Sequence, residues 1–147
     1  MTVKALQAKT VEESLQKLCP NAGILEENGC LVIEKDFITD VMRLLRNSPY
    51  YCLDYLSSLT GVDHLDFFEV IYHLMSISRQ HSITIKTRCS GRDNLEIPSV
   101  TPIWQGADLQ EREIFDLLGI NFTGHPNMKR IVLWEGFEGH PLRKDYL

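Results

Sequence analysis

The chain of 147 residues is long enough for one compact domain with a substantial hydrophobic core. Apolar residues make up 44% and charged residues 24%, fractions that exclude an intrinsically disordered or fibrous protein. The net charge of −5 argues against non-specific nucleic-acid binding, and no apolar run approaches the length of a membrane span. Met1 is not followed by a secretory leader, so we expect a cytoplasmic protein that reaches a membrane only through a partner.

The cysteines are far apart in the sequence and form no Cys-x-x-Cys pair; they are Cys19, Cys30, Cys52 and Cys89. Iron–sulfur clusters and structural zinc sites require thiolates at short, regular spacings. We therefore expect free thiols in a reducing compartment and no redox centre in this chain.

The N-terminal part is expected to form a helix and then a β-hairpin. Thr10 and Glu13 match the capping box that opens a helix, and Pro20 ends it. The apolar stripe of this helix comprises Val11, Leu15 and Leu18. Asn28-Gly29 lies between two short apolar segments, which is a strong hairpin signal.

A second helix is expected after Asp36, which is a suitable N-cap residue. It ends before the breaker Asn47-Ser48-Pro49. Its apolar residues recur at helical spacing and are Phe37, Ile38, Val41, Met42, Leu44 and Leu45.

The middle of the chain predicts an antiparallel strand pair. Residues Tyr50–Asp63 fit either a helix or a short strand, and the pattern does not decide between them. Phe67–Ser78 is rich in β-branched and aromatic residues and is predicted to form a long strand. After a tight loop at Arg79-Gln80, apolar and polar residues alternate along His81–Arg88, which indicates a strand with one buried face.

A third helix is expected near the C-terminus. Asp108 and Glu111 match a capping box, and Gly119 is placed to end the helix after Leu118. Its apolar face comprises Ile114, Leu117 and Leu118. Arg112 and Asp116 are four residues apart, a spacing that favours an ion pair on the helix surface.

The order of these elements predicts an α+β fold, a two-layer domain with a mixed, largely antiparallel sheet packed against helices. Residues 1–100 are expected to form its core. Residues 101–147 add the third helix and an extended, charged segment of the same domain. We call the residues that follow Gly119 the C-terminal arm.

The C-terminal arm repeats a short pattern in which Gly-His-Pro precedes a pair of basic residues. Gly124-His125-Pro126 leads to Lys129-Arg130, and Gly139-His140-Pro141 leads to Arg143-Lys144. Each histidine precedes a proline, and the chain has no helical His-x-x-x-His motif. Turn histidines that bond to the backbone are therefore favoured over metal ligands.

These residues resemble one family, the 30-kilodalton subunit of respiratory complex I, also called the C subunit of NADH dehydrogenase. The matching segments are Glu111-Arg112-Glu113, Asp116-Leu117-Leu118-Gly119-Ile120, Gly124-His125-Pro126, Lys129-Arg130-Ile131 and Phe137–Tyr146. Their order and spacing make the match specific. The resemblance extends back through Pro98–Trp104 and the strand pair before it.

The resemblance implies a subunit without a redox centre in the peripheral arm of complex I. It would lie against the 49-kilodalton-like and 20-kilodalton-like subunits, which hold the quinone site and the terminal cluster. We therefore expect a non-catalytic structural and assembly subunit that binds no cofactor and has no functional homo-oligomer. The host complex would carry the iron–sulfur clusters and use NADH and quinone.

Aromatic and arginine residues dominate the energetics of protein interfaces, and an extended segment needs a surface to cover. Ile131 and Leu133 could equally fold back over their own domain. The predicted partner interface comprises Glu111, Arg112, Glu113, Asp116, His125, Arg130, Trp134, Phe137, His140, Arg143, Lys144 and Tyr146. We expect Arg143 and Lys144 to be solvated in the isolated domain.

Two other functions fit the sequence less well. Typical relatives continue past Tyr146, whereas this sequence stops at Leu147, a short form that also fits membrane-bound nickel–iron hydrogenases and formate hydrogenlyase. Their homologous subunit would serve a host complex with a nickel–iron centre. The more distant alternative is a standalone metal-dependent hydrolase that uses His125 and His140.

Overall fold

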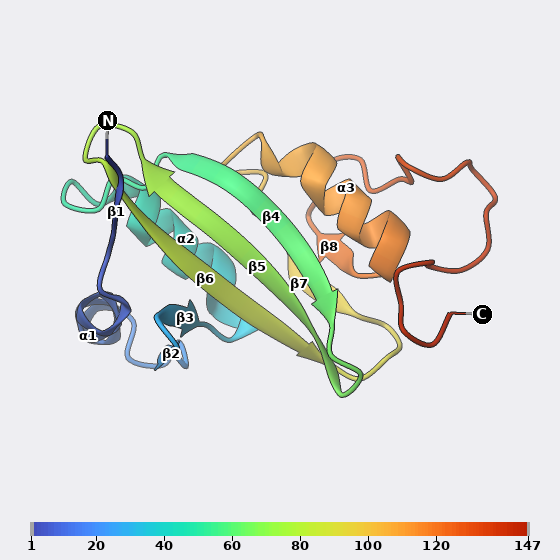
Figure 1. The fold of residues 1–147 in the computed structure, drawn as a ribbon, viewed down its shortest axis with the longest axis horizontal. Coiled ribbons are helices and arrows are strands. Elements are labelled where there is room, and N and C mark those ends of the chain that lie inside the picture. Colours follow the sequence, from blue (N-terminus) through green and yellow to red (C-terminus); the bar gives the residue numbers. More distant parts are fainter. Residues whose placement is uncertain (1, 147) are drawn as a thin grey trace.

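The computed structural model describes residues 2–146, which form a mixed sheet with helices on one face (Figure 1). The helical elements are α1 (Ala8–Leu18), the short 3₁₀ helix η1 (Lys35–Phe37), α2 (Ile38–Asn47) and α3 (Ala107–Leu118). The strands are β1 (Lys4–Ala5), β2 (Leu25–Glu27), β3 (Cys30–Val32), β4 (Tyr55–Asp63), β5 (Phe67–Ser76), β6 (His81–Ser90), β7 (Glu96–Pro98) and β8 (Asn121–Thr123). The predicted α+β fold is confirmed.

The main sheet has six strands in the order β2-β3-β6-β5-β4, with β1 also paired to β6. The pairs β1–β6 and β3–β6 are parallel and the others are antiparallel. A separate small sheet joins β7 and β8 in parallel. This small sheet fixes the segments on either side of α3.

The β5–β6 hairpin at the centre of the sheet confirms the alternation in the sequence. It is in continuous register from Phe67 opposite Ser90 to Ser76 opposite His81. On β6 the side chains of Ile83, Ile85 and Thr87 are buried, as their alternation predicts.

The ambiguous segment Tyr50–Asp63 contains β4 from Tyr55 onward. This strand pairs antiparallel with β5 and has a bulge between Leu56 and Ser58. Pairing with a neighbouring strand decided the outcome, because the leucine spacing alone fits both a helix and a strand.

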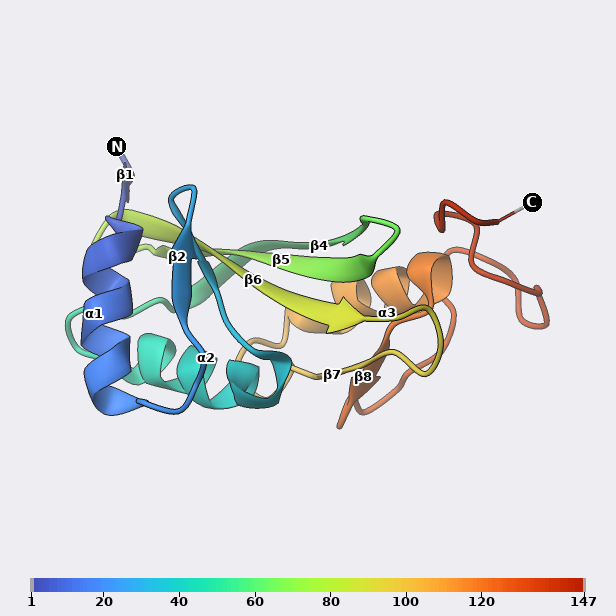
Figure 2. The ribbon, with the colours of Figure 1, turned by 90° about the horizontal axis from the view of Figure 1, so that it is seen from below.

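The three α-helices lie on the same side of the main sheet, as Figure 2 shows. Ser82, Thr84 and Lys86 of β6 lie on the opposite, open face and are partly exposed. One continuous core, with buried apolar residues from Ala8 to Phe122, fills the space between the sheet and the helices. Its largest fully buried side chains are Tyr72, Phe68, Phe122, Leu15, Leu31, Ile33, Ile38, Met42, Leu45, Leu53, Leu74 and Ile85.

The sequence signals for the helix starts are wrong at all three helices. Their N-cap residues are Gln7, Phe37 and Gly106, and none of these makes a side-chain capping bond. Thr10 lies inside α1 and Asp36 lies in η1. Leu18, expected on the buried stripe of α1, is also exposed. The helices are held by their apolar faces, so weak capping is tolerated.

The predicted hairpin at Asn28-Gly29 is confirmed, since β2 and β3 pair antiparallel across it. Both turn residues have positive φ, 53° for Asn28 and 81° for Gly29. This conformation is that of a type I′ turn, which suits the twist of two strands.

Candidate functional site: the C-terminal arm and helix α3

The C-terminal arm runs from Ile120 through β8 and then lacks regular secondary structure as far as Tyr146. It loops away from the sheet beyond α3, at the end of the molecule opposite α1 (Figure 1). A segment of this kind keeps a defined shape only if side chains fix its backbone.

Asp116 of α3 is the main attachment point for the C-terminal arm. Its fully buried Oδ2 accepts hydrogen bonds from the backbone N–H groups of Ile131, Val132 and Leu133, at 3.1, 2.8 and 2.7 Å. Its Oδ1 accepts a 2.5 Å hydrogen bond from Nη1 of Arg130. One carboxylate therefore fixes four consecutive residues of the arm.

The predicted surface ion pair between Arg112 and Asp116 is wrong. Arg112 instead donates to the carbonyl oxygens of Lys129 and Arg130, at 3.0 and 3.1 Å. Burial alone would raise the pKa of Asp116, but the bonds from Leu133, Arg130 and their neighbours hold it below its ordinary value. The carboxylate is therefore charged at neutral pH.

The arm also closes the C-terminal end of α3, whose last carbonyl groups have no partner within the helix. His140 Nδ1 bonds to the carbonyl of Asp116 at 2.9 Å, and Arg143 Nε donates to that of Leu118 at 2.6 Å. The N–H of Leu142 donates to the carbonyl of Leu117 at 2.9 Å. As predicted, Gly119 ends the helix, with a φ of 82°.

A third attachment joins the arm to the end of β4 through Asp63. This carboxylate accepts a bidentate pair from Arg92, at 2.6 and 2.8 Å, and a 2.9 Å bond from the N–H of Lys144. Arg92 also pairs with Asp145 at 3.0 Å. The bonds from Arg92 hold the pKa of Asp63 well below its usual range.

The expectation that Arg143 is solvated is wrong. Its guanidinium donates to the carbonyls of Leu118 and Arg92 and lies 5.1 Å from the centre of the Phe68 ring. The side chain of Arg143 is thus an internal support of the fold. Lys144, its neighbour, is exposed.

This contrast predicts different effects for two adjacent substitutions. Arg143→Ala should lower the free energy of unfolding by about 1–3 kcal/mol, because two carbonyls lose a charged donor. Lys144→Ala should change it by less than about 0.5 kcal/mol, because its N–H bond to Asp63 remains. Urea denaturation of both variants measures the difference, and equal losses would contradict the role of Arg143 described above.

The N-terminal half of α3 carries a second buried carboxylate, Glu111. Its oxygens accept hydrogen bonds from Ser99 Oγ at 2.6 Å and from the N–H of Val100 at 2.9 Å. Glu111 therefore holds in place the segment that follows β7 and leads into α3. Burial raises the pKa of Glu111, although these two bonds oppose the shift.

His125 lies beside this carboxylate with its side chain fully buried. Its Nδ1 accepts a 2.9 Å hydrogen bond from the N–H of Asn127, so the proton is on Nε2. Nε2 lies 3.1 Å from the carbonyl oxygen of Asp108, 3.0 Å from its Oδ1 and 4.0 Å from Glu111 Oε1. Both ring nitrogens are therefore engaged within the chain.

The two histidines are attached at opposite ends of α3. His125 contacts Asp108 and His140 contacts Asp116, eight residues apart and thus about 12 Å along a helix. Within residues 2–146, no group of three or more His, Cys, Asp or Glu side chains is arranged to hold a metal ion. The structure therefore separates His125 from His140, the two histidines of the hydrolase alternative.

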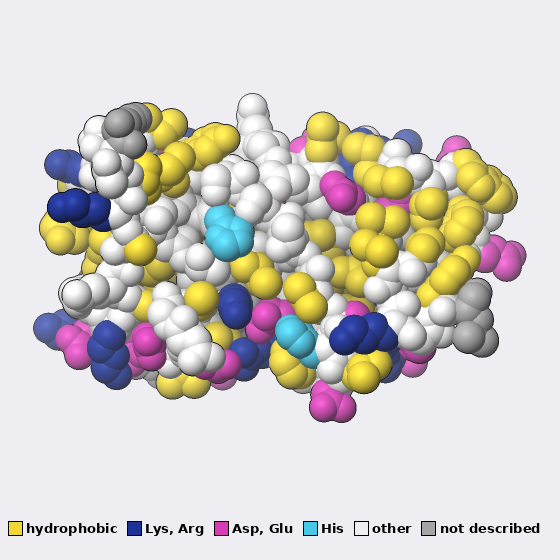
Figure 3. All heavy atoms as spheres, in the orientation of Figure 1, with side chains coloured by type: hydrophobic (Ala, Val, Ile, Leu, Met, Phe, Trp, Pro, Cys, Tyr) yellow, Lys and Arg dark blue, Asp and Glu magenta, His cyan; other side chains and the backbone are white. Residues whose placement is uncertain are grey.

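Apolar side chains are exposed along the outer side of the C-terminal arm. We call this set the arm surface; it comprises Ile131, Val132, Trp134, Leu142 and Tyr146, which are 40, 58, 69, 61 and 42% exposed. Phe137 lies among them, with its ring centre 5.9 Å from that of Trp134 and 6.5 Å from that of Tyr146. Hydrophobic atoms are dense at this end of the molecule in Figure 3.

The structure divides the predicted interface residues by exposure. The exposed ones are Glu113, Trp134, Lys144 and Tyr146, and the fully buried ones are Glu111 and Asp116. As whole residues, Arg112, Arg130, Phe137, His140 and Arg143 are intermediate, and so is His125, although its side chain is fully buried. The two buried carboxylates, Glu111 and Asp116, bond within the chain and do not reach its surface.

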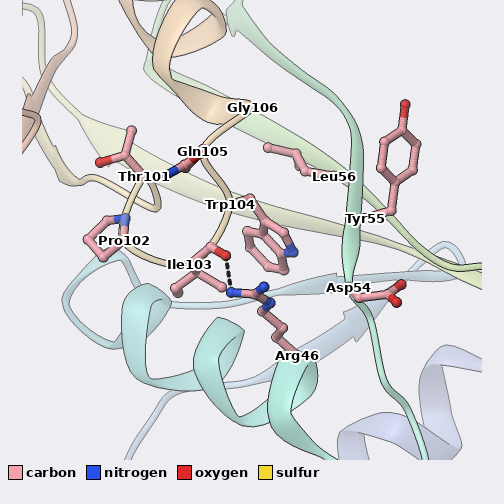
Figure 4. A pocket seen from close by; sticks show the side chains of 10 residues that line it. All are labelled: Arg46, Asp54, Tyr55, Leu56, Thr101, Pro102, Ile103, Trp104, Gln105 and Gly106. Carbon is pink, nitrogen blue, oxygen red and sulfur yellow. Dashed lines mark hydrogen bonds between the residues drawn. The ribbon is translucent and has the colours of Figure 1, made fainter.

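A separate hollow of about 420 Å³ lies between α2, β4 and the loop before α3 (Figure 4). Arg46 donates to the carbonyl of Ile103, and Trp104 Nε1 donates to that of Leu53 at 3.2 Å. The polar groups around this hollow thus anchor residues 101–106, which lead into α3.

Sequence reasoning missed Asp63 and Arg92 entirely, and gave Asp116 a different role. Residues 63 and 92 come together only because β4 and the loop after β6 meet at one end of the sheet. Gly61 was also missed, although a glycine inside a strand indicates close approach by another segment. A Cβ at Gly61 would lie 2.6 Å from Leu118 Cδ1, so glycine lets α3 pack against β4.

No helix among residues 2–146 has the length and apolar character that a membrane span requires. Residues 31–147 match the family model of the respiratory-chain NADH dehydrogenase 30-kilodalton subunit. The sequence is 45% identical over 148 residues to the C subunit of NADH-quinone oxidoreductase from Roseiflexus castenholzii, covering 96% of this chain and 84% of that protein. It is 38% identical over 138 residues to the same subunit from Moorella thermoacetica, covering 91% of each.

Among solved structures, a chain of the membrane-bound sulfane sulfur reductase, an archaeal respiratory membrane complex, shares the fold. The TM-score is 0.75 at 23% identity, covering 96% of this chain and 86% of that one. The family match and the close relatives together identify the chain as a member of the 30-kilodalton subunit family of respiratory-chain NADH dehydrogenase.

Proposed function

We propose that this chain is a non-catalytic structural subunit in the peripheral arm of a complex I-type oxidoreductase. It would brace the 49-kilodalton-like and 20-kilodalton-like subunits, which would hold the quinone site and the terminal cluster. Iron–sulfur and quinone chemistry would then belong to those partners. The chain would join the membrane-associated complex peripherally, through them.

The arm surface is the observation that carries this proposal. Trp134, Leu142 and Val132 are each more than half exposed, although large apolar side chains favour burial. Asp116 and Arg130 fix the backbone beneath them, so little conformational entropy is lost when a partner binds. A rigid aromatic surface of this kind suits a permanent protein interface.

The relatives favour a host that reduces quinone, since those from Roseiflexus castenholzii and Moorella thermoacetica are both named as the C subunit of an NADH-quinone oxidoreductase. The archaeal sulfane sulfur reductase shows that the fold also serves a membrane complex with another substrate. A host of the hydrogenase type would carry a large subunit with nickel-ligating cysteine pairs. The neighbouring genes distinguish these hosts.

Trp134→Ala tests the proposal. Co-expressed with the two partner subunits from the same organism, this variant should capture them at least about tenfold less well than the native chain, because a central aromatic anchor is lost. Tyr50→Ala is a matched control, since Tyr50 is 71% exposed and lies beside Thr10 and Val11 of α1, at the end of the molecule opposite the arm. Pull-down yields and the urea denaturation midpoint are measured for both.

We expect both variants to have the same urea denaturation midpoint as the native chain. A loss of capture would then report on binding alone. Equal capture by Trp134→Ala, Tyr50→Ala and the native chain would exclude the arm surface as the partner interface.

A further inference from the structure

The outer edge of β4 is the last strand edge of the main sheet on its side. In an antiparallel pair, alternate residues bond to the neighbouring strand and the others point away from it. The N–H of His64 bonds to the carbonyl of Phe67 at 2.9 Å, whereas the N–H of Leu59 bonds to Gln110 Oε1 at 2.7 Å. The same alternation directs the N–H and C=O of Gly61 and Asp63 away from β5.

One of these three outward positions is closed by another part of the chain, because Gln110 of α3 accepts the N–H of Leu59. At Asp63 the arm bonds to the side-chain carboxylate, which accepts the N–H of Lys144, and not to the strand backbone. At Gly61, between them, no other described element supplies a hydrogen bond to the backbone. Among the described residues, the outward backbone groups of Gly61 therefore have no hydrogen-bond partner.

An apolar groove of about 190 Å³ adjoins this open position. It lies between β4 and α3, and its lining includes Gly61, Ile114, Leu117, Leu118, Leu142 and Glu113. Gly61 adds no side chain to the groove, and Leu118 and Ile114 of α3 pack close to it, 2.6 and 3.1 Å from where a Cβ would lie. Its size suits one large apolar side chain.

We propose that this groove binds an extended segment of a partner subunit. One residue of that segment pairs its N–H and C=O with those of Gly61, and an adjacent apolar side chain enters the groove. A Lys or Arg next to it would pair with the exposed Glu113 at the rim. This inference rests on the proposed function and names how the partner is held.

The surroundings favour a partner subunit over a second copy of this chain. Leu142 belongs both to the groove and to the arm surface, so a partner on that surface reaches the groove directly. Two copies paired at Gly61 would bring their Glu113 carboxylates close together. Like charges at close range oppose such a dimer.

Amide hydrogen exchange tests the pairing at Gly61. Exchange at Gly61 should slow by about tenfold or more when the native chain is assembled with the co-expressed partner subunits. Thr60 is the internal control, because its N–H already faces Ile71 in the β4–β5 ladder. Its exchange should change much less.

Leu142→Asp changes a residue shared by the groove and the arm surface, and it leaves the backbone bond from its N–H to Leu117 in place. We expect about tenfold weaker capture of the partner subunits. Leu109→Asp is the matched control, since Leu109 is 57% exposed on α3 and does not line the groove. It should bind as the native chain does.

The outcomes separate this inference from the proposed function. If Trp134→Ala lowers capture while Gly61 exchanges at the same rate in the complex, the groove inference is wrong and the proposed function stands. If Gly61 becomes protected when the chain only self-associates, the segment that binds the groove belongs to a second copy of this chain and not to a partner subunit. Failure of the native chain to capture any partner subunit would overturn both.

Discussion

Asp116→Ala should release the C-terminal arm from α3 and lower the free energy of unfolding by about 3–5 kcal/mol. The substitution leaves the Arg130 guanidinium and the N–H groups of Ile131, Val132 and Leu133 without their shared acceptor. Urea denaturation measures the loss. Trypsin should also cleave faster after Lys129 and Arg130, because the arm is no longer held.

Glu113→Ala is the control, since Glu113 is an exposed carboxylate on the same helix. It should change the free energy of unfolding by less than about 0.5 kcal/mol. Similar stability losses for Asp116→Ala and Glu113→Ala would show that Asp116 does not hold the arm.

The pH dependence of this stabilisation follows from the lowered pKa of Asp116. A group whose pKa is lower in the folded state stabilises the fold above its unfolded pKa, about 4, and loses that contribution as the pH falls further. The stability difference between the native chain and Asp116→Asn should therefore shrink below about pH 4.

Glu111→Ala is expected to have the second-largest effect, a loss of roughly 2–4 kcal/mol. It would leave a cavity and deprive Ser99 and the N–H of Val100 of their buried partner. Glu111→Gln keeps an acceptor for Val100 and offers a donor to Ser99, so it should cost less than about 1 kcal/mol near neutral pH. Urea denaturation compares the two variants.

The pH effect at Glu111 has the opposite sign, because burial raises its pKa. Its protonated form stabilises the fold at low pH, and this contribution is lost as the pH rises through the folded pKa. Glu111→Gln does not titrate and should gain stability relative to the native chain as the pH rises above the ordinary pKa of glutamate, about 4. A stability difference that stays constant as the pH rises from about 4 would show that Glu111 does not titrate differently in the folded state.

The elements that the sequence predicted correctly depend on local patterns. The alternation from His81 to Arg88 and the Asn28-Gly29 turn each encode their structure within a few residues, and both are confirmed. The predicted helix starts are wrong because the two residues of a capping box are ordinary polar residues, which also occur away from helix starts. At α3, Glu111 bonds to Ser99 and Val100 instead of to its own helix end.

The attachments of the C-terminal arm could not be predicted from spacing. Arg112 and Asp116 fit an i, i+4 pair, but the arm supplies better partners to both. Arg143 follows a turn and resembles a solvated residue until the end of α3 is placed beside it. Such contacts depend on tertiary structure, and no local periodicity encodes them.

The bond between the N–H of Lys144 and Asp63 spans 81 residues of sequence, and this separation bears on the order of folding. During synthesis the strands of the main sheet leave the ribosome well before the arm, so they can pair while α3 still lacks its C-terminal closure. Contacts between distant residues form late, because their loop-closure entropy is lost before they contribute. We therefore expect the arm surface to be completed last, which would delay partner binding until the sheet has folded.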